Sequence, residues 1–322
     1  MKHIVIAIDA NPGFLKQVGV MLFSLLKHNQ DPITLHVLHT PEAKDPFEFQ
    51  REQISHFVGT TQVNLQRHVV TLESIKKLGL TVYNNLPLTT YFRLLIPKIL
   101  GEDIEVCLYL DGDIVIRGSI DPLFSLQSTP EWRAAAVMTN VLTNYMDNLN
   151  LDCYFNAWVL LMNVKAWRNN NISANIINFI VQYPNWLKGT QPIMGDQCGI
   201  NYICNTHISV LEPIWNTTPL WFNPDYMNIP LSEQLTHFGY DNDQILQCQQ
   251  NPIILHFAGT NKPCDWICVH PRKMEYYRYL FEGWLITKVD FAKVIWHMIT
   301  YPMRMDRKLF QIIKKLRNIV IN

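Results

Sequence analysis

The stretch VCLYLDGDIVI, residues 106–116, holds two carboxylates one residue apart inside a run of apolar and aromatic side chains. An apolar run of this length predicts a buried strand of a parallel sheet. Open α/β sheets bind ligands at the carboxyl ends of their strands, and the Asp-Gly-Asp lies where such a strand would end. In extended chain Asp111 and Asp113 point the same way, so their oxygens can converge on one cation. Carboxylates suit Mg²⁺ or Mn²⁺, whereas the simpler alternative is an acidic turn.

The segments around this stretch alternate between strand and helix patterns. Strands are expected at 4–8, 33–38, 63–70, 134–138 and 157–163, and helices at 14–27, 45–57 and 89–100. Alternation over the first hundred residues indicates parallel βαβ units, and hence an α/β fold with a mostly parallel central sheet. No repeat and no linker rich in Gly or Ser divides the chain. We therefore expect one domain over residues 1–275 and a helical basic tail over residues 276–322.

Composition narrows the class of protein. Of the 322 residues, 48% are hydrophobic and 17% are charged, which is typical of a packed globular chain. Seven cysteines, an odd number set in apolar runs, indicate reduced thiols in a cytoplasmic protein. The first nine residues are too short and too soon acidic for a signal peptide, and no apolar run is long enough for a transmembrane helix. The main domain has no basic patch, so we expect no nucleic-acid partner.

The tail differs from the rest of the chain in charge. From Leu285 to Asn322 it has eight basic and two acidic residues, a net charge of +6 in a chain whose total is zero. An aromatic cluster lies over residues 276–284, and the segments 286–299 and 308–321 are amphipathic. A basic amphipathic helix with aromatic anchors suits an anionic membrane surface. The alternative is that the tail packs on the domain or forms a dimer contact.

Polar residues follow or interrupt other apolar segments. A glycine-rich phosphate loop is missing, so a bound diphosphate would need a metal and side chains to neutralise it. Asp9 and Asn11 follow the first strand, Arg93 stands in an apolar helix, and Asn156 begins a later strand. His256-Phe257-Ala258-Gly259-Thr260-Asn261-Lys262-Pro263 combines an imidazole, a flexible loop and a lysine. Each also has a structural interpretation: a salt-bridged Arg93, a core His256, a turn-capping Asn156, a helix-capping Asp196 or a solvated Lys262.

Together these segments resemble glycosyltransferase family 8, which comprises retaining, metal-dependent enzymes that use nucleotide-diphosphate sugars. Three motifs occur in the family's order: Leu-Tyr-Leu-Asp-Gly-Asp from residue 108, Tyr-Phe-Asn-Ala from residue 154, and His-x-x-Gly-x-x-Lys-Pro from residue 256. The resemblance runs from Ile4 to about Trp266. It is closest to the bacterial branch that adds glucose or galactose to lipopolysaccharide or lipooligosaccharide. It implies a single nucleotide-sugar-binding domain of the GT-A-like type.

The resemblance also implies roles for individual residues. Asp111, Asp113 and His256 match the ligands of Mn²⁺, for which Mg²⁺ is the alternative. The other matches are Asp9 and Asn11 at the base and ribose, Arg93 and Asp111 at the donor, Asn156, Asp196 and Gln197 along the donor sugar, and Gly259 and Lys262 in the loop over the diphosphate. A glutamine is a poor nucleophile but can stabilise an oxocarbenium-like centre. We therefore expect attack on the same face as departure, with Gln197 and Asp196 as the catalytic residues.

The sequence departs from the family pattern at four positions. Pro12 stands where an aromatic residue often stacks on the base, so Phe14 or another ring must replace it. Trp158 occupies a position that is usually Gly or Ser, which would reshape the sugar pocket or the acceptor cleft. Asn140, or alternatively Thr139, stands where an acidic residue is common on the acceptor side, and Asp265 separates Pro263 from Trp266. A zinc site at Cys264, Cys268 and His270 is a weaker alternative because it lacks a fourth ligand.

The predicted function is transfer of glucose or galactose from UDP-glucose or UDP-galactose to a lipid-linked oligosaccharide, at the cytoplasmic face of the plasma membrane. Two alternatives stay open. One is a protein or starter-glycan glucosyltransferase of the glycogenin-like kind, which adds sugar to a tyrosine of its own. The other is a catalytically inactive module that binds a sugar nucleotide or a glycan.

Overall fold

The structure is a computed structural model. It describes residues 1–43, 63–81, 87–126, 132–139, 151, 153–182, 195–222, 239–259, 262–266, 268, 270–283 and 287–300. The helices expected at 45–57 and 308–321 therefore lie outside the described residues.

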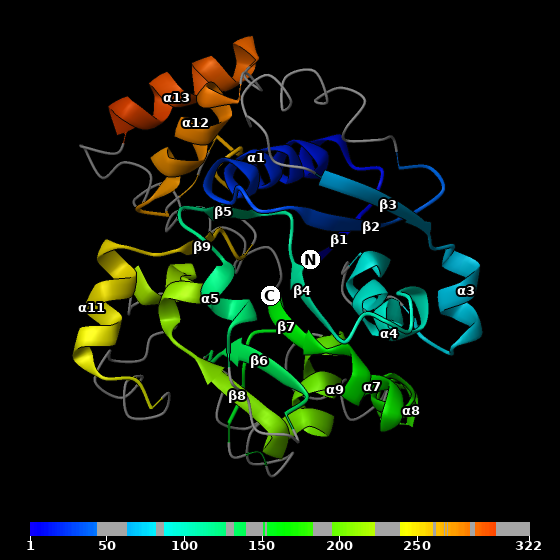
Figure 1. The fold of residues 1–322 in the computed structure, drawn as a ribbon. Coiled ribbons are helices and arrows are strands. Elements are labelled where there is room, and N and C mark those ends of the chain that lie inside the picture. Colours follow the sequence, from blue (N-terminus) through cyan, green and yellow to red (C-terminus); the bar gives the residue numbers. More distant parts are fainter. Residues whose placement is uncertain are drawn as a thin grey trace, which may run out of the picture.

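A seven-stranded sheet in the order β3-β2-β1-β4-β7-β6-β8 forms the centre of the molecule (Figure 1). The strands are β1 Lys2–Ile8, β2 Ile33–His39, β3 Val63–Val69, β4 Val106–Leu110, β6 Ala134–Val137, β7 Val159–Asn163 and β8 Ile208–Leu211. Strands β3, β2, β1 and β4 are parallel to one another, β6 pairs in parallel with β8, and β7 is antiparallel to both its neighbours. The predicted α/β fold with a mostly parallel sheet is thus confirmed.

Helix α1, Pro12–His28, covers one face of the sheet. Residues 17–26 are all buried, and the helix packs against strand β5, Ile114–Ile116, and helix α12, Lys273–Glu282. Asn11 caps its N-terminus by accepting hydrogen bonds from the backbone N–H groups of Gly13 and Phe14. This cap places the start of α1 directly after the carboxyl end of β1.

A second group of helices packs together beside β1, β4 and β7. It comprises α3 Leu72–Lys77, α4 Ile96–Ile99, α7 Val164–Asn169, α8 Ile172–Gln182, α9 Gly195–Cys204 and the 3₁₀ helix η1 Leu88–Leu95. The helix expected at 89–100 is therefore mostly 3₁₀ and only its last turn is α-helical. Further short elements lie between residues 121 and 250: α5 Asp121–Phe124, η3 Asn205–His207, η4 Pro213–Trp215, η5 Pro219–Phe222 and α11 Asn242–Gln250.

The apolar stretch 106–116 forms two strands: the first ends at the Asp-Gly-Asp, as predicted, and a second strand follows it. Strand β4 ends at Leu110, the chain turns at Asp-Gly-Asp, and β5, Ile114–Ile116, pairs antiparallel with β9, Ile254–His256, in a separate two-stranded sheet. Gly112 lies against α1: a Cβ there would be 2.6 Å from Cγ2 of Val18 and 2.7 Å from Cζ of Phe14. This turn places His256 opposite Ile114, close to both carboxylates.

Helices α12 and α13, Lys288–Thr300, lie beside α1 (Figure 1). Tyr276, Tyr277 and Tyr279 are buried in the same hydrophobic core as the central sheet. Lys16 on α1 forms an ion pair of 2.6 Å with Asp290 on α13. The division of the chain at residue 275 stays a prediction, but α12 contributes to the core of the preceding domain.

All seven cysteines are free thiols, as predicted. Among the helices that the structure describes, none is long and apolar enough to cross a bilayer.

Candidate metal and nucleotide-sugar site

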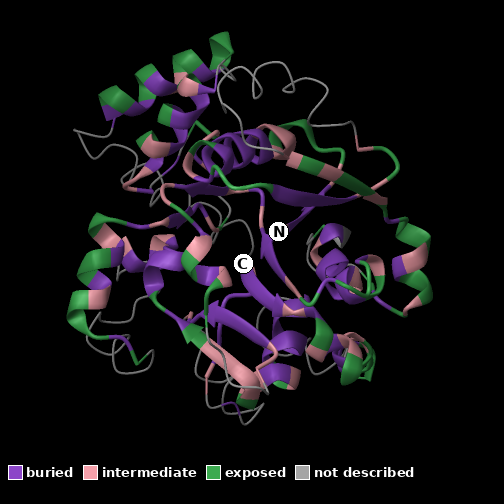
Figure 2. Cartoon of the chain, viewed as in Figure 1, coloured by how far each residue is buried: buried purple, intermediate pink, exposed green. Residues whose placement is uncertain are grey.

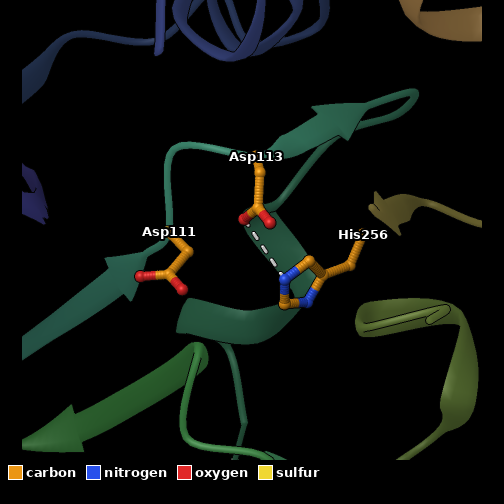
Figure 3. Close-up of side chains that lie close together, drawn as sticks. All are labelled: Asp111, Asp113 and His256. Atoms are coloured by element: carbon orange, nitrogen blue, oxygen red, sulfur yellow. Dashed lines mark ion pairs between the residues drawn. The ribbon is translucent and has the colours of Figure 1, made fainter. Parts of the chain in front are cut away.

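Asp111, Asp113 and His256 converge at the carboxyl end of β4 (Figure 3). Asp111 directly follows β4, Asp113 directly precedes β5, and His256 ends β9. One potential ligand atom of each residue lies within 4.8 Å of those of the other two. The pairing of β5 with β9 brings together residues that are far apart in the sequence, as the three-residue metal site requires.

Two amides in series hold the imidazole of His256. Its Nδ1 lies 2.8 Å from Oδ1 of Asn216, and Nδ2 of Asn216 donates to Oδ1 of Asn156 over 2.9 Å. All three residues are buried. Because the amide oxygen of Asn216 can only accept, Nδ1 carries the proton and the Nε2 lone pair is available to a metal.

The residues present fit a divalent cation. Nε2 of His256 is buried without a hydrogen bond of acceptable geometry, although Oδ1 of Asp113 lies 3.3 Å away. Two carboxylates and one neutral imidazole form a donor set that suits Mn²⁺, with Mg²⁺ as the harder alternative. Among the residues that the structure describes, no other group of three potential ligands converges in this way. Cys264, Cys268 and His270 therefore do not form the zinc site considered as an alternative.

Asp113 and Asp111 are in different electrostatic environments. Burial opposes ionisation of Asp113, but the nearby ammonium of Lys262 favours it, and the pKa of Asp113 is lowered. Nζ of Lys262 contacts Oδ2 of Asp113 and also donates to the carbonyl of Phe257 over 2.9 Å. Burial and the charge of Asp113 raise the pKa of Asp111, although Arg93 opposes the shift. A cation bound between Asp111 and Asp113 would thus relieve the repulsion between the two carboxylates.

A buried ion pair lies next to the metal ligands. Nε of Arg93 is 2.7 Å from Oδ2 of Asp196, and both side chains are almost fully buried. Burial raises the pKa of Asp196 to about 6 although Arg93 opposes the shift. The guanidinium lies 4.6 Å from the ring centre of Tyr109, whose hydroxyl donates to Oδ1 of Asp111 over 2.8 Å. Arg93 is thereby connected to the Asp-Gly-Asp turn through one aromatic ring.

The segment Asn156-Ala157-Trp158 lies between this ion pair and the metal ligands. Its central carbonyl accepts a hydrogen bond from Nη1 of Arg93, and the N–H of Ala157 donates to Oε1 of Gln197 over 3.0 Å. The side chain of Gln197 is buried, so in this structure it supports the segment. Its predicted place at the reacting face of the sugar stays a prediction.

The predicted nucleotide-binding residues lie at the same edge of the sheet. Asp9 and Asn11 follow β1, which is the parallel neighbour of β4, and Oδ1 of Asp9 accepts from the N–H of Asn11 over 2.9 Å. Pro12 begins α1, and Phe14 lies against Gly112 of the Asp-Gly-Asp turn. Their contacts to a base or ribose remain predictions.

The predicted diphosphate loop begins after β9. Gly259 has a φ of 101°, in the left-handed region that favours glycine. The N–H of Lys262 donates to Oδ2 of Asp265 over 2.7 Å, so the unusual Asp265 supports the loop that carries the lysine. Asn140 lies outside the described residues.

Asn216 and Tyr109 are the site residues that the sequence analysis missed. Tyr109 belongs to the Leu-Tyr-Leu-Asp-Gly-Asp motif but had no predicted role in the site, and Asn216 belongs to none of the three motifs. The bond between Asn216 and His256 spans 40 positions of sequence, so no local spacing could have indicated it.

Comparison with known proteins agrees with the motifs. The sequence pattern of glycosyl transferase family 8 matches residues 3–267. General stress protein A of Bacillus subtilis (strain 168) is 26% identical over 289 residues, which cover 86% of this chain and 92% of that protein. Lipopolysaccharide glucosyltransferase WaaO of Escherichia coli (strain K12) is 24% identical over 275 residues, 83% of this chain and 74% of that protein.

A solved structure, the galactosyltransferase LgtC in complex with donor and acceptor sugar analogs, has the same fold. It superposes with a TM-score of 0.69 at 20% identity, covering 90% of this chain and 99% of that one. The matched residues include all three potential metal ligands and the Arg93–Asp196 pair. The chain belongs to glycosyl transferase family 8 and is a glycosyltransferase.

Proposed function

We propose that this enzyme transfers glucose or galactose from a UDP-sugar to a lipid-linked glycan, with retention of the anomeric configuration and with a divalent cation, Mn²⁺ or Mg²⁺. The observation that carries the proposal is the convergence of Asp111, Asp113 and His256 beside the buried Arg93–Asp196 pair, in a chain of family 8. The first group suits a diphosphate and its cation. The second offers charged hydrogen-bonding groups to a sugar attached to that diphosphate.

The diphosphate end of the donor is assigned to the first group. When bound there, the cation supplies Lewis-acid stabilisation of the negative charge that develops on the leaving diphosphate. Asn216 and Asn156 keep the Nε2 lone pair of His256 directed at the carboxylates. Lys262 contributes a fixed positive charge to the phosphates, since its ammonium already lies at Asp113.

The sugar end is assigned to the Arg93–Asp196 pair and its neighbours. The carboxylate of Asp196 is buried beside Arg93, and because a carboxylate can accept about four hydrogen bonds it keeps acceptor capacity for sugar hydroxyls. Gln197 holds the backbone at Ala157, next to this pair. In our proposal the acceptor attacks the face from which the diphosphate leaves, and these groups stabilise the positive charge on the sugar.

The assignment of a lipid-linked acceptor rests on the surface of α13. In this helix Asp290, Val294, His297 and Thr300 face the protein, whereas Val289, Phe291, Ile295, Trp296, Met298 and Ile299 are exposed (Figure 2). The helix therefore turns its more polar side inward and its apolar side outward, the reverse of an ordinary surface helix. An apolar face that is followed in the sequence by a strongly basic segment suits the interface of an anionic membrane, where a lipid-linked acceptor is found.

Release of UDP from a panel of UDP-sugars tests this function. We expect release from UDP-glucose or UDP-galactose with Mn²⁺, and none with EDTA. Release that is equal with and without metal would reject the metal-dependent mechanism. Intact-mass spectrometry after the same incubation separates the alternative: stepwise hexose additions to the protein itself would indicate a glycogenin-like enzyme.

A further inference from the structure

Trp158 lies directly across from Asp111 in the pairing of β4 with β7. The last pair of the ladder is Leu110 with Val159, and the backbone N–H of Asp111 donates to the carbonyl of Trp158 over 3.0 Å, which carries the register one pair further. Residues opposite each other in antiparallel strands point to the same face, with their Cβ atoms about 5 Å apart. The side chain of Trp158 is therefore on the same face as the carboxylate of Asp111.

The indole of Trp158 also reaches the third metal ligand. Its ring centre is 5.3 Å from that of His256, and the two rings are inclined at 72°, so the edge of one meets the face of the other. The backbone N–H of Trp158 donates to Oδ1 of Asn156 over 2.9 Å, the same oxygen that accepts from Asn216. Trp158 is thus fixed between Asp111 and His256 by its main chain as well as by its ring.

Exposure distinguishes Trp158 from its neighbours. Every other residue from Tyr154 to Met162 is buried, whereas Trp158 is only partly buried. A tryptophan that served only as packing in this strand would be covered like the residues around it. Trp158 instead keeps part of its surface accessible, opposite Asp111 and in contact with the ring of His256. An indole in this setting suits a ligand that is polar at its rim and apolar on one face, as a pyranose is.

We propose that Trp158 is the wall of the site against which the pyranose ring of the sugar nucleotide stacks, and that it selects the sugar rather than the metal or the nucleotide. The proposal rests on the proposed function, because the diphosphate at Asp111 and His256 is what brings the sugar to the indole. In a sugar nucleotide the sugar is bonded directly to the diphosphate. A diphosphate held at Asp111 and His256 therefore brings the sugar within reach of the indole of Trp158, which contacts His256 and lies opposite Asp111.

Binding measurements without an acceptor test this assignment. The affinities of UDP and of UDP-glucose or UDP-galactose are measured by calorimetry in the presence of Mn²⁺, for the wild type, Trp158→Ala and Trp158→Phe. We expect Trp158→Ala to weaken binding of the sugar nucleotide about tenfold or more, relative to its effect on UDP, and Trp158→Phe to restore most of it. Trp296→Ala, which removes an exposed tryptophan from α13, is the matched control and should change neither affinity.

Tryptophan fluorescence of the wild-type protein gives a second readout. The difference in emission between the wild type and Trp158→Phe is the contribution of Trp158. This contribution should change when the sugar nucleotide binds and not when UDP alone binds. Equal weakening of UDP and of the sugar nucleotide would overturn the assignment, because Trp158 would then only support the metal ligands. Unchanged donor affinity with a raised KM for the acceptor would also overturn it. If the wild type binds no UDP with Mn²⁺, the proposed function fails, which is a different result from either.

Discussion

Asn216 is the residue whose role is clearest from geometry and least visible in the sequence. It contacts His256 but none of the proposed ligands of the diphosphate, so we expect it to act through the orientation of the imidazole. Replacing such a supporting residue typically costs a metal site about 10- to 100-fold in affinity. Asn216→Ala should therefore lower the affinity for Mn²⁺ by this factor, as measured by the electron paramagnetic resonance signal of free Mn²⁺. Asn175→Ala, on the exposed side of α8, is the matched control, and equal affinities in the two variants would contradict the role of Asn216.

The Arg93–Asp196 pair makes a separate prediction at the same scale. Both side chains are buried, so removal of one partner leaves the other charged without compensation. Such a loss costs about 3–5 kcal/mol of folding free energy. We expect Asp196→Ala to lower the stability in urea by this order. An exposed ion pair serves as control: Glu105→Ala, which loses the contact with Lys165, should cost less than about 1 kcal/mol. Similar losses in the two variants would show that the buried pair is not special.

At the scale of elements, three strands share a row of histidines. Nδ1 of His3 on β1 lies 3.0 Å from Nε2 of His36 on β2, and Nδ1 of His36 lies 3.1 Å from Nε2 of His68 on β3. A neutral imidazole can donate at one nitrogen and accept at the other, whereas a protonated one can only donate. Burial, with the neighbouring rings of His3 and His68, lowers the pKa of His36 to about 4. Burial and the neighbouring rings therefore favour a neutral His36, which donates to one neighbour and accepts from the other.

The pH dependence follows from the sign of that shift. Because the pKa of His36 is lower in the folded state, its contribution to stability is complete above pH ~6.5 and is lost as the pH falls towards 4, up to about 3 kcal/mol. Urea unfolding between pH 7.5 and 4.5 should show this loss in the wild type and a smaller one in His36→Phe. His207→Gln, a histidine of η3 outside the row, should keep the full dependence. Parallel stability curves for the wild type and His36→Phe would contradict the assignment.

The elements also show what the sequence could predict. The pattern of apolar residues predicted the positions of β1, α1, β2, β3, β6 and β7 within a few residues. It could do so because the apolar residues of each element are the ones that it packs against the rest of the protein. The separate strand after the Asp-Gly-Asp escaped prediction, because it depends on contacts of Gly112 with Phe14 and Val18 and on the pairing of β5 with β9. The metal ligands came from the motifs, but the support of His256 by Asn216 depends on the fold.

The whole molecule combines a site at the carboxyl edge of the sheet with an apolar surface on α13. If that surface enters a membrane, a charge placed in it should weaken binding to vesicles that contain phosphatidylglycerol. Burying an aliphatic side chain contributes about 1.5–3 kcal/mol, so Ile299→Glu should reduce partitioning roughly tenfold or more. Added salt should also weaken the binding of the wild type to these vesicles, because it screens the attraction between basic side chains and anionic lipids.

Leu246→Glu is the matched control for this experiment. Leu246 on α11 is 51% exposed and Ile299 is 53% exposed, so the two substitutions differ in place and not in exposure. We expect Leu246→Glu to leave vesicle binding unchanged and both variants to keep release of UDP from a soluble donor. Equal vesicle binding by the two variants would exclude α13 as the membrane contact.

The central claim is that Asp111, Asp113 and His256 bind the cation that brings the nucleotide-diphosphate to this edge of the sheet. Calorimetric titration with UDP, with Mn²⁺ or with EDTA, tests it most directly in the wild type, Asp113→Asn, His256→Ala and the surface control Glu105→Gln. The site predicts that the wild type and Glu105→Gln bind UDP only with Mn²⁺, and that the other two variants lose this binding while they remain folded. UDP binding of equal strength in EDTA, or in His256→Ala with Mn²⁺, would contradict the claim.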